Sequence, residues 1–267
     1  MPLSYSQLQT YRTCPRQYEY AFVKKLDRPL SAEESFGSSM HNTLKKWGER
    51  EKEGSRQKAV GSDQLHLFTG DTTQQDSDFC LLTSDHLHSL WHQSFIVEGY
   101  ASRIEADFQR KVGEQILQHF FAWWEQESRV VVGVESSFKY QLGDGSETLT
   151  GRLDRVERTL KGLRIIDFKT GQPRTQEQCD SDLQLSIYAL AAKQIYEEPV
   201  DELILLFLNE EGITERRTHR NESQLRDAEK SITSLITRIQ EKDFAPTPSF
   251  PVCSRCPYKG ICDVAAA

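Results

Sequence analysis

The chain has 267 residues, of which 37% are hydrophobic and 27% are charged, a composition typical of a soluble globular protein with a sizeable core. Its longest apolar run, residues 203–208, is far shorter than the ~20 residues of a membrane helix. The first residues also lack a signal peptide's basic and apolar regions, so we expect a cytoplasmic protein. The net charge of −7 argues against a protein that coats nucleic acid, but it allows a local basic groove.

The N-terminal part is predicted to be helical. Ser4 and Gln7 have the spacing of a capping box and indicate a helix start. Apolar residues recur at helical spacing over residues 36–47, which predicts a second helix. Residues 51–85 are polar and without clear periodicity, so we interpret them as an insertion or mobile loop. Helical spacing resumes at Phe108 and predicts a helix that ends near Trp124.

The middle of the chain changes to strand periodicity. Three antiparallel strands are predicted over residues 130–140, 148–158 and 163–169, separated by glycine-containing turns. A helix over 183–191, a strand over 203–208 and a helix that begins near Asn221 follow. Pro246, Pro248 and Pro251 then predict an extended arm. Strands and helices in this order indicate an α/β fold.

Two carboxylates are expected to meet within the predicted strands. Asp167 and Lys169 share one face of their strand, and pairing with the preceding strand brings Asp154 beside Asp167. On the alternation of that preceding strand, Asp154 shares a face with Val156. Two neighbouring carboxylates repel each other unless a cation such as Mg²⁺ neutralises them. Such a site could hydrolyse a phosphodiester, with Lys169 orienting water or stabilising the transition state. The alternative is a pair of exposed acids in surface ion pairs.

Four further side chains are candidates for the same site. Gln184 and Tyr188 lie one helical turn apart and can face one groove, where they could touch a phosphate or a base. His41 could complete a metal shell as a neutral imidazole, and Glu135 could reach the site from the first strand. The alternatives are a half-buried tyrosine, a structural histidine and a solvated acid.

The cysteines suggest a second kind of metal site. Cys253, Cys256 and Cys262 form a CxxC-x5-C pattern, and Cys14 can supply a fourth thiolate. Four thiolates suit zinc or an iron–sulfur cluster, and the spacing alone favours zinc. Such a site would join the two ends of the chain. We interpret Cys80 and Cys179 as thiols without a ligand role.

The N-terminal segment is locally basic. Residues 1–48 contain seven basic and four acidic residues, Arg12 and Arg16 among the former. The interleaved Tyr11, Tyr18 and Tyr20 could stack on unpaired bases. The alternative is a solvated helix face with the tyrosines in the core.

Taken together, the motifs GSSMH, GRLDRV, IIDFKTG and QLSIY, in this order, resemble the RecB-like branch of the PD-(D/E)XK nuclease superfamily. The N-terminal LSYSQLQTYRTCPRQYEY and the terminal CSRCPYKGIC are similar to its iron–sulfur members. These include AddB nuclease domains, CRISPR-adaptation nucleases and stand-alone RecB-type exonucleases. The resemblance covers nearly the whole chain except residues 51–100.

The resemblance implies roles for individual residues. His41, Asp154 and Asp167 would be metal ligands with the Phe168 carbonyl, and Lys169 would be the catalytic lysine. Gln184 and Tyr188 would form a QxxxY motif along the DNA, with Arg12, Arg16 and Tyr11 as further contacts. The four-cysteine arrangement matches the family's [4Fe–4S] pattern, which reverses the preference for zinc. Asp167 stands where many superfamily members have Glu.

The resemblance also implies a fold and a function. We expect one domain with a restriction-endonuclease-like core, in which helices flank a mixed central sheet. Its parts would be a helical N-terminal part (1–50), an insertion (51–100), the nuclease core (101–245) and an iron–sulfur arm (246–267). The predicted function is Mg²⁺- or Mn²⁺-dependent DNA exonuclease activity on single-stranded ends in repair or recombination.

Three alternatives stay open. One is a CRISPR spacer-processing nuclease with a CRISPR-adaptation partner. The second is a non-catalytic DNA-end-binding module that works with a helicase, although Asp154, Asp167 and Lys169 argue against it. The third is a zinc-bound scaffold.

Overall fold

The computed structural model describes residues 2–62, 82–143, 145 and 147–266. The strands are β1 (Leu3–Ser4), β2 (Val130–Leu142), β3 (Glu147–Arg158), β4 (Leu163–Thr170), β5 (Val200–Asn209) and β6 (Gly212–Thr218). The long helices are α3 (Ala32–Ser62), α4 (Ser84–Ser94), α5 (Arg103–Trp124), α7 (Leu183–Tyr196) and α8 (Glu222–Gln240). The shorter ones are α1 (Tyr5–Thr13), α2 (Pro15–Tyr18), the π-helix η1 (Glu19–Val23), α6 (Gln176–Asp180) and α9 (Phe250–Cys253).

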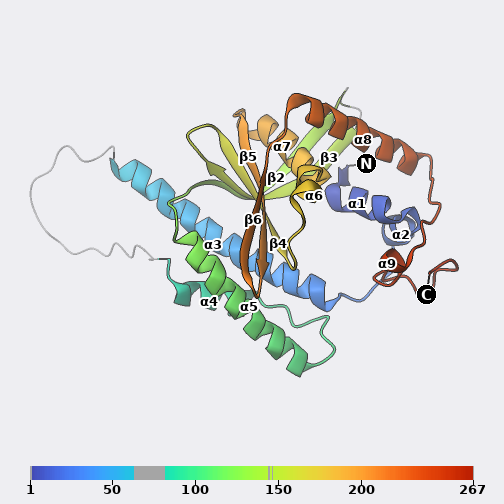
Figure 1. The fold of residues 1–267 in the computed structure, drawn as a ribbon, viewed down its shortest axis with the longest axis horizontal. Coiled ribbons are helices and arrows are strands. Elements are labelled where there is room, and N and C mark those ends of the chain that lie inside the picture. Colours follow the sequence, from blue (N-terminus) through green and yellow to red (C-terminus); the bar gives the residue numbers. More distant parts are fainter. Residues whose placement is uncertain (1, 63–81, 144, 146, 267) are drawn as a thin grey trace, which may run out of the picture.

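A mixed sheet of six strands forms the centre of the fold (Figure 1). The order β1-β3-β4-β5-β6 combines antiparallel β3–β4 and β5–β6 pairs with parallel β1–β3 and β4–β5 pairs, and β2 pairs with β3. The expected α/β fold with a mixed central sheet flanked by helices is therefore confirmed.

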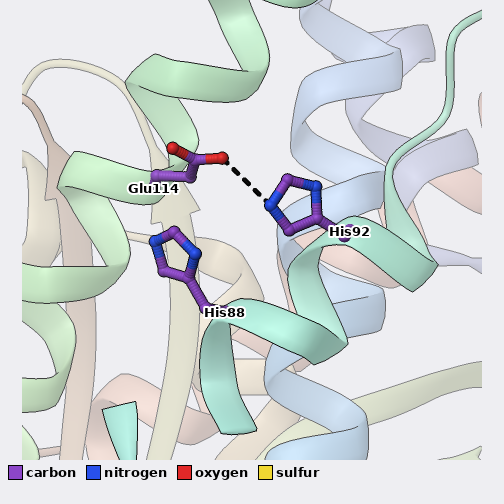
Figure 2. A group of neighbouring side chains, drawn as sticks. All are labelled: His88, His92 and Glu114. Carbon is purple, nitrogen blue, oxygen red and sulfur yellow. Dashed lines mark ion pairs between the residues drawn. The ribbon is translucent and has the colours of Figure 1, made fainter. Parts of the chain in front are cut away.

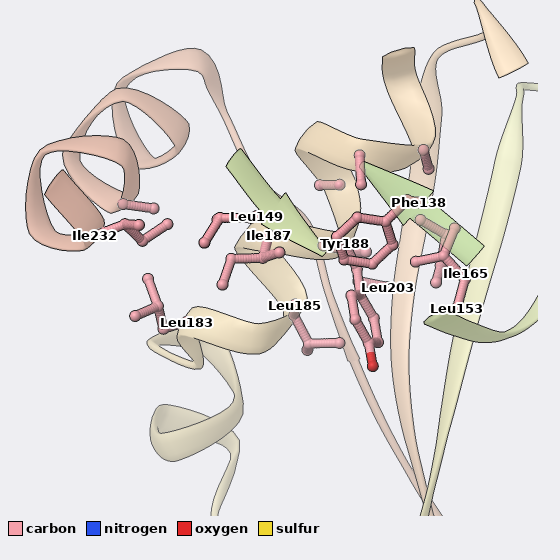
Figure 3. Packing of buried hydrophobic residues seen from close by; sticks show 14 of the residues in the cluster. Phe138, Leu149, Leu153, Ile165, Leu183, Leu185, Ile187, Tyr188, Leu203 and Ile232 are labelled. Carbon is pink, nitrogen blue, oxygen red and sulfur yellow. The ribbon is translucent and has the colours of Figure 1, made fainter. Parts of the chain in front are cut away.

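Helices cover both faces of this sheet (Figure 1). On one face, α7 and α8 pack on the strands, and α1 contributes Leu8 and Tyr11 to the same core. Figure 3 shows part of this core, and its labelled side chains include Ile232 of α8, Leu185 of α7 and Leu203 of β5. The other face carries α3, α4 and α5, which bury three tryptophans with the opposite side chains of β4 and β5. Alternate residues of β4 and β5 thus enter different cores, as strand geometry requires.

A buried ionic network fixes α3 against β3. The Arg155 guanidinium donates to both carboxylate oxygens of Glu51 at 2.7 and 2.9 Å, and to Glu157 at 2.7 Å. Buried charges persist only when such partners satisfy them. Because His41 lies on the same helix as Glu51, this network also sets the position of His41 relative to β3.

The predicted helices and the four predicted strands are present, with differences at some boundaries. Ser4 caps α1 through a capping box with Gln7, and Asn221 caps α8 in the same way with Gln224. The loop interpretation is wrong for residues 51–62, where α3 continues. Residues 84–94 form α4, which buries Leu87, Leu90 and Trp91. Strand β6 was not predicted.

One predicted detail of β3 is wrong. Val156 lies in the same core as Leu153, so the alternation of side chains is interrupted between them and Asp154 does not share the face of Val156.

None of the described helices is long and apolar enough to cross a membrane.

Candidate active site

Asp154 and Asp167 come together where strands β3 and β4 separate. The two strands pair only from Arg155 with Ile166 to Arg158 with Leu163. Beyond this ladder, the Asp154 carboxylate accepts a hydrogen bond from the Phe168 backbone N–H at 3.0 Å. The Phe168 N–H therefore bonds to the Asp154 side chain where a backbone hydrogen bond would have continued the ladder. As a result, the Asp154 carboxylate lies at the opening between the two strands.

Both carboxylates are withdrawn from solvent. Asp154 is 9% exposed and Asp167 is 1% exposed. Burial, followed by the charge of Asp167, holds the pKa of Asp154 well above its usual range. The nearest cation is the Lys169 ammonium, whose Nζ lies 2.6 Å from Asp167 Oδ2. Two buried acids side by side carry more negative charge than one ammonium balances, and a divalent cation would neutralise the excess.

His41 reaches the same point from α3. Its Nδ1 atom lies 3.4 Å from Asp154 Oδ2, and its ring interacts with the Phe168 backbone carbonyl. Burial lowers the pKa of His41, which favours the neutral imidazole that can ligate a metal. The structure therefore brings together His41, Asp154 and the Phe168 carbonyl, as expected for the proposed ligands.

Lys169 connects the acids to helix α7. Its Nζ lies 2.6 Å from Asp167 Oδ2 and donates to Gln184 Oε1 at 2.8 Å. The Gln184 amide in turn donates to the Tyr188 hydroxyl at 2.7 Å. Burial, and then the charges of Asp167 and Asp154, raise the pKa of Tyr188. Gln184 and Tyr188 are buried and line the cleft described below, so in this structure they position the lysine.

Glu135 is a third acid at the site. One oxygen of its carboxylate, one ring nitrogen of His41 and one carboxylate oxygen of Asp154 all lie within 4.8 Å of one another. Glu135 also forms an ion pair with Arg152 at 3.2 Å. Its backbone has a φ of 45° within β2, a conformation that non-glycine residues rarely adopt and that often marks functional sites. The group of one imidazole nitrogen and two carboxylates, with Asp167 next to Asp154, is a donor set that fits Mg²⁺ or Mn²⁺.

An open cleft of about 1160 Å³ leads to this group. Its walls come from α1, α3, β2, β3 and α7, and its lining includes His41, Asp154 and Glu135. Three cations also line it, namely Lys45, Lys139 and Arg152. Phosphate contacts from such side chains position a nucleic-acid strand. Sequence reasoning did not identify these three as a group, because they come from different elements.

The three predicted N-terminal DNA contacts, Tyr11, Arg12 and Arg16, do not line this cleft. Tyr11 is 1% exposed and donates from its hydroxyl to the Asp243 backbone carbonyl at 2.6 Å. Tyr18 and Tyr20 are buried as well. The stacking expectation for Tyr11 is therefore wrong, and the alternative of core tyrosines is confirmed. Arg12 is exposed, whereas Arg16 is partly buried and pairs with Glu19 at 3.3 Å.

The four predicted thiolate ligands line one small pocket. Cys14 precedes α2, Cys253 ends α9, and Cys256 and Cys262 follow it. Burial raises the pKa of Cys256, and the neighbouring thiols of Cys14, Cys262 and Cys253 raise it further. Burial also opposes ionisation of Cys14, but hydrogen bonds from Thr247, Gln17 and Arg16 lower its pKa overall. Four sulfur ligands from both ends of the chain fit a thiolate-bound metal centre.

The two remaining cysteines were predicted to have no ligand role. Cys179 is buried in the core around α7. Cys80 lies outside the described residues.

Comparison with known proteins agrees with this geometry. The chain matches the model of the PD-(D/E)XK nuclease superfamily over residues 2–263, and it belongs to that superfamily. Membership implies a metal-dependent nuclease that acts on DNA. A search among curated proteins found no match. Among solved structures, the chain is similar to the crystal structure of SSO0001, with 15% identity and a TM-score of 0.39, over 80% of this chain and 97% of that one.

Proposed function

We propose that this protein is a Mg²⁺- or Mn²⁺-dependent DNA exonuclease that degrades single-stranded ends in repair or recombination. The observation that carries the proposal is that His41, Glu135 and Asp154 line one cleft with ligand atoms within 4.8 Å of one another, while the Asp167–Lys169 pair lies beside Asp154. His41, Asp154 and Asp167 would hold the ion with the Phe168 carbonyl. When bound, the ion supplies positive charge at the scissile phosphate and activates water.

The protein's own residues have separate tasks in this proposal. Lys169 lies between Asp167 and Gln184, so its ammonium group is held in place and can stabilise negative charge that develops on the phosphate. Tyr188 fixes the Gln184 amide. Lys45 of α3 and Lys139 of β2 line the cleft and can bind neighbouring phosphates.

The size of the cleft supports a single-stranded substrate. Its volume of about 1160 Å³ is close to that of ordinary small-molecule pockets, roughly 300–1000 Å³. Asp154 and Glu135 line the cleft, and Asp154 is only 9% exposed, so a phosphate must enter the cleft to reach them. A strand end can do this more easily than an intact duplex.

The cofactor proposal is a [4Fe–4S] cluster on Cys14, Cys253, Cys256 and Cys262. The four cysteines line one small pocket, and four thiolates suit zinc as well as an iron–sulfur cluster. The resemblance of the four-cysteine pattern to that of the iron–sulfur members favours the cluster.

A cleavage assay tests the proposed activity. Oligonucleotides labelled at the 5′ or 3′ end, a blunt duplex and a circular single strand are incubated with Mg²⁺, Mn²⁺ or a chelator. We expect metal-dependent shortening of the linear single strand, slower loss of the duplex and no cleavage of the circle.

Each other outcome contradicts the proposal in a distinct way. Cleavage of the circle would identify an endonuclease. Trimming of overhangs that stops at the duplex junction would favour the spacer-processing alternative. Tight binding of ends without cleavage, by protein that holds its metal, would favour the non-catalytic module.

Because His41 would ligate the ion, we expect cleavage to be faster with Mn²⁺ than with Mg²⁺. Imidazole is a softer donor than carboxylate and suits Mn²⁺ better than Mg²⁺. His41→Ala should raise the Mn²⁺ concentration for half-maximal rate by about tenfold or more, with little change in DNA affinity. His219→Ala, outside the cleft, is the control. Wild-type rates for His41→Ala across a Mn²⁺ titration would show that oxygen atoms alone hold the ion.

A further inference from the structure

A second group of metal-binding side chains lies between α4 and α5 (Figure 2). It consists of His88 and His92 of α4 and Glu114 of α5. None of the three lines the nuclease cleft or the cysteine pocket. The proposed exonuclease function gives this group no role.

The three ligand atoms already lie close together. The two histidines are one helical turn apart, so they occupy the same side of α4, and their ring centroids are 5.7 Å apart. His92 Nε2 is 3.1 Å from a Glu114 carboxylate oxygen. One nitrogen from each ring and this oxygen all fall within 4.8 Å of one another. Figure 2 shows both rings beside the carboxylate.

The surrounding packing holds the two helices in this relation. Leu87, Leu90 and Trp91 anchor α4 in the core. The Trp91 indole N–H donates to the Arg110 backbone carbonyl of α5 at 2.9 Å. A Cβ at Gly113 would lie 2.0 Å from the Trp91 ring, so only glycine allows α5 to approach this closely. Glu114 follows Gly113 in α5, so this close packing also fixes the position of Glu114 relative to α4.

An ion pair alone does not account for the group. A half-exposed His92–Glu114 pair contributes little to stability. It also does not explain why a second imidazole, that of His88, lies beside the same carboxylate. Two imidazoles and one carboxylate are the protein ligands of many zinc sites that keep a fourth position open for water. Both His88 and Glu114 are only partly exposed, while His92 reaches solvent, so the ion could enter from the surface.

We propose that His88, His92 and Glu114 form a second metal site that binds Zn²⁺ and cross-links α4 to α5. The ligand set is richer in nitrogen than the cleft and therefore selects a softer ion than Mg²⁺. Because the site depends on the folded helix pair, zinc binding stabilises the folded state.

Zinc uptake by the whole protein tests this proposal. Purified protein is dialysed to equilibrium against Zn²⁺ with excess Mg²⁺, which occupies the nuclease cleft, and bound zinc is measured by mass spectrometry. We expect His88→Ala and His92→Ala to bind one zinc fewer per chain than wild type, and Glu114→Gln to bind it more weakly. Zinc held by the cysteines is common to all samples and cancels in the difference.

His86→Ala is the matched control, because it removes an imidazole from the same helix but outside the group. It should bind as much zinc as wild type. Zinc should also raise the Tm of wild type and His86→Ala more than that of His88→Ala. Equal zinc content in wild type and in His88→Ala and His92→Ala proteins that retain nuclease activity would overturn the proposal.

Discussion

Replacing Asp154 or Asp167 by Asn, or Lys169 by Ala, is expected to lower the cleavage rate by about 10³-fold or more, which corresponds to ~4 kcal/mol of transition-state stabilisation. In the proposed mechanism the two acids would hold the ion, and the lysine would offset charge that develops on the phosphate. Single-turnover cleavage of an end-labelled single strand measures the loss. Asp227→Asn, an exposed acid on α8, is the control and should cleave at the wild-type rate.

Stability measurements separate this loss from misfolding. Because burial raises the pKa of Asp154, the ionised carboxylate opposes folding in metal-free protein at neutral pH. Asn keeps an oxygen that can accept the Phe168 N–H bond. Asp154→Asn should therefore unfold at the same or a higher urea concentration without metal, although it is inactive. Wild-type turnover by a folded Asp167→Asn protein would disprove the site assignment.

Local sequence signals predicted most of the elements. The capping boxes at Ser4 and Asn221 are local hydrogen-bond patterns, so spacing alone locates them. The β2–β3–β4 order follows from strand periodicity and short turns. Strand β6 carries charged residues at 215–217 and lies at the sheet edge. Edge strands often carry such charges, which removes the alternation that would identify them.

The continuation of α3 past residue 50 depends on a contact that the sequence does not reveal. Glu51 looks like a solvent residue, yet it is buried against Arg155 of β3, far along the chain. Tyr11 was misplaced for a related reason. Its partner, the Asp243 carbonyl, comes from the other end of the chain, so only the tertiary fold makes it a core residue.

The candidate site was predictable as a set but not in its geometry. Asp154, Asp167 and Lys169 share two neighbouring strands, so pairing rules bring them together. His41 required the family motifs, because nothing local relates α3 to β3. The left-handed backbone of Glu135 and the replacement of a ladder bond by the Asp154 side chain are properties of the folded sheet.

Protein purified without oxygen is expected to be brown and to contain iron and sulfide, and each of the substitutions Cys14→Ser, Cys253→Ser, Cys256→Ser and Cys262→Ser should abolish both. In the proposed site the four thiolates would be the only bonds between cluster and chain, so three would be insufficient for a stable site. Iron and sulfide analysis and the visible absorption spectrum measure the outcome. Cys179→Ser and Cys80→Ser are the controls, and both should keep the cluster.

Loss of the cluster should also lower the Tm, since the ligands join residues near both ends of the chain. A cross-link over so long a loop restricts the unfolded chain strongly, and metal-binding energy is released only on folding. The Tyr11–Asp243 and Thr13–Thr247 hydrogen bonds join the same two segments but cannot replace that link, because each contributes only about 1 kcal/mol. Cys179→Ser should lower Tm without loss of iron, which distinguishes core packing from ligation. Stoichiometric zinc without sulfide in the wild-type protein would instead identify a four-cysteine zinc site.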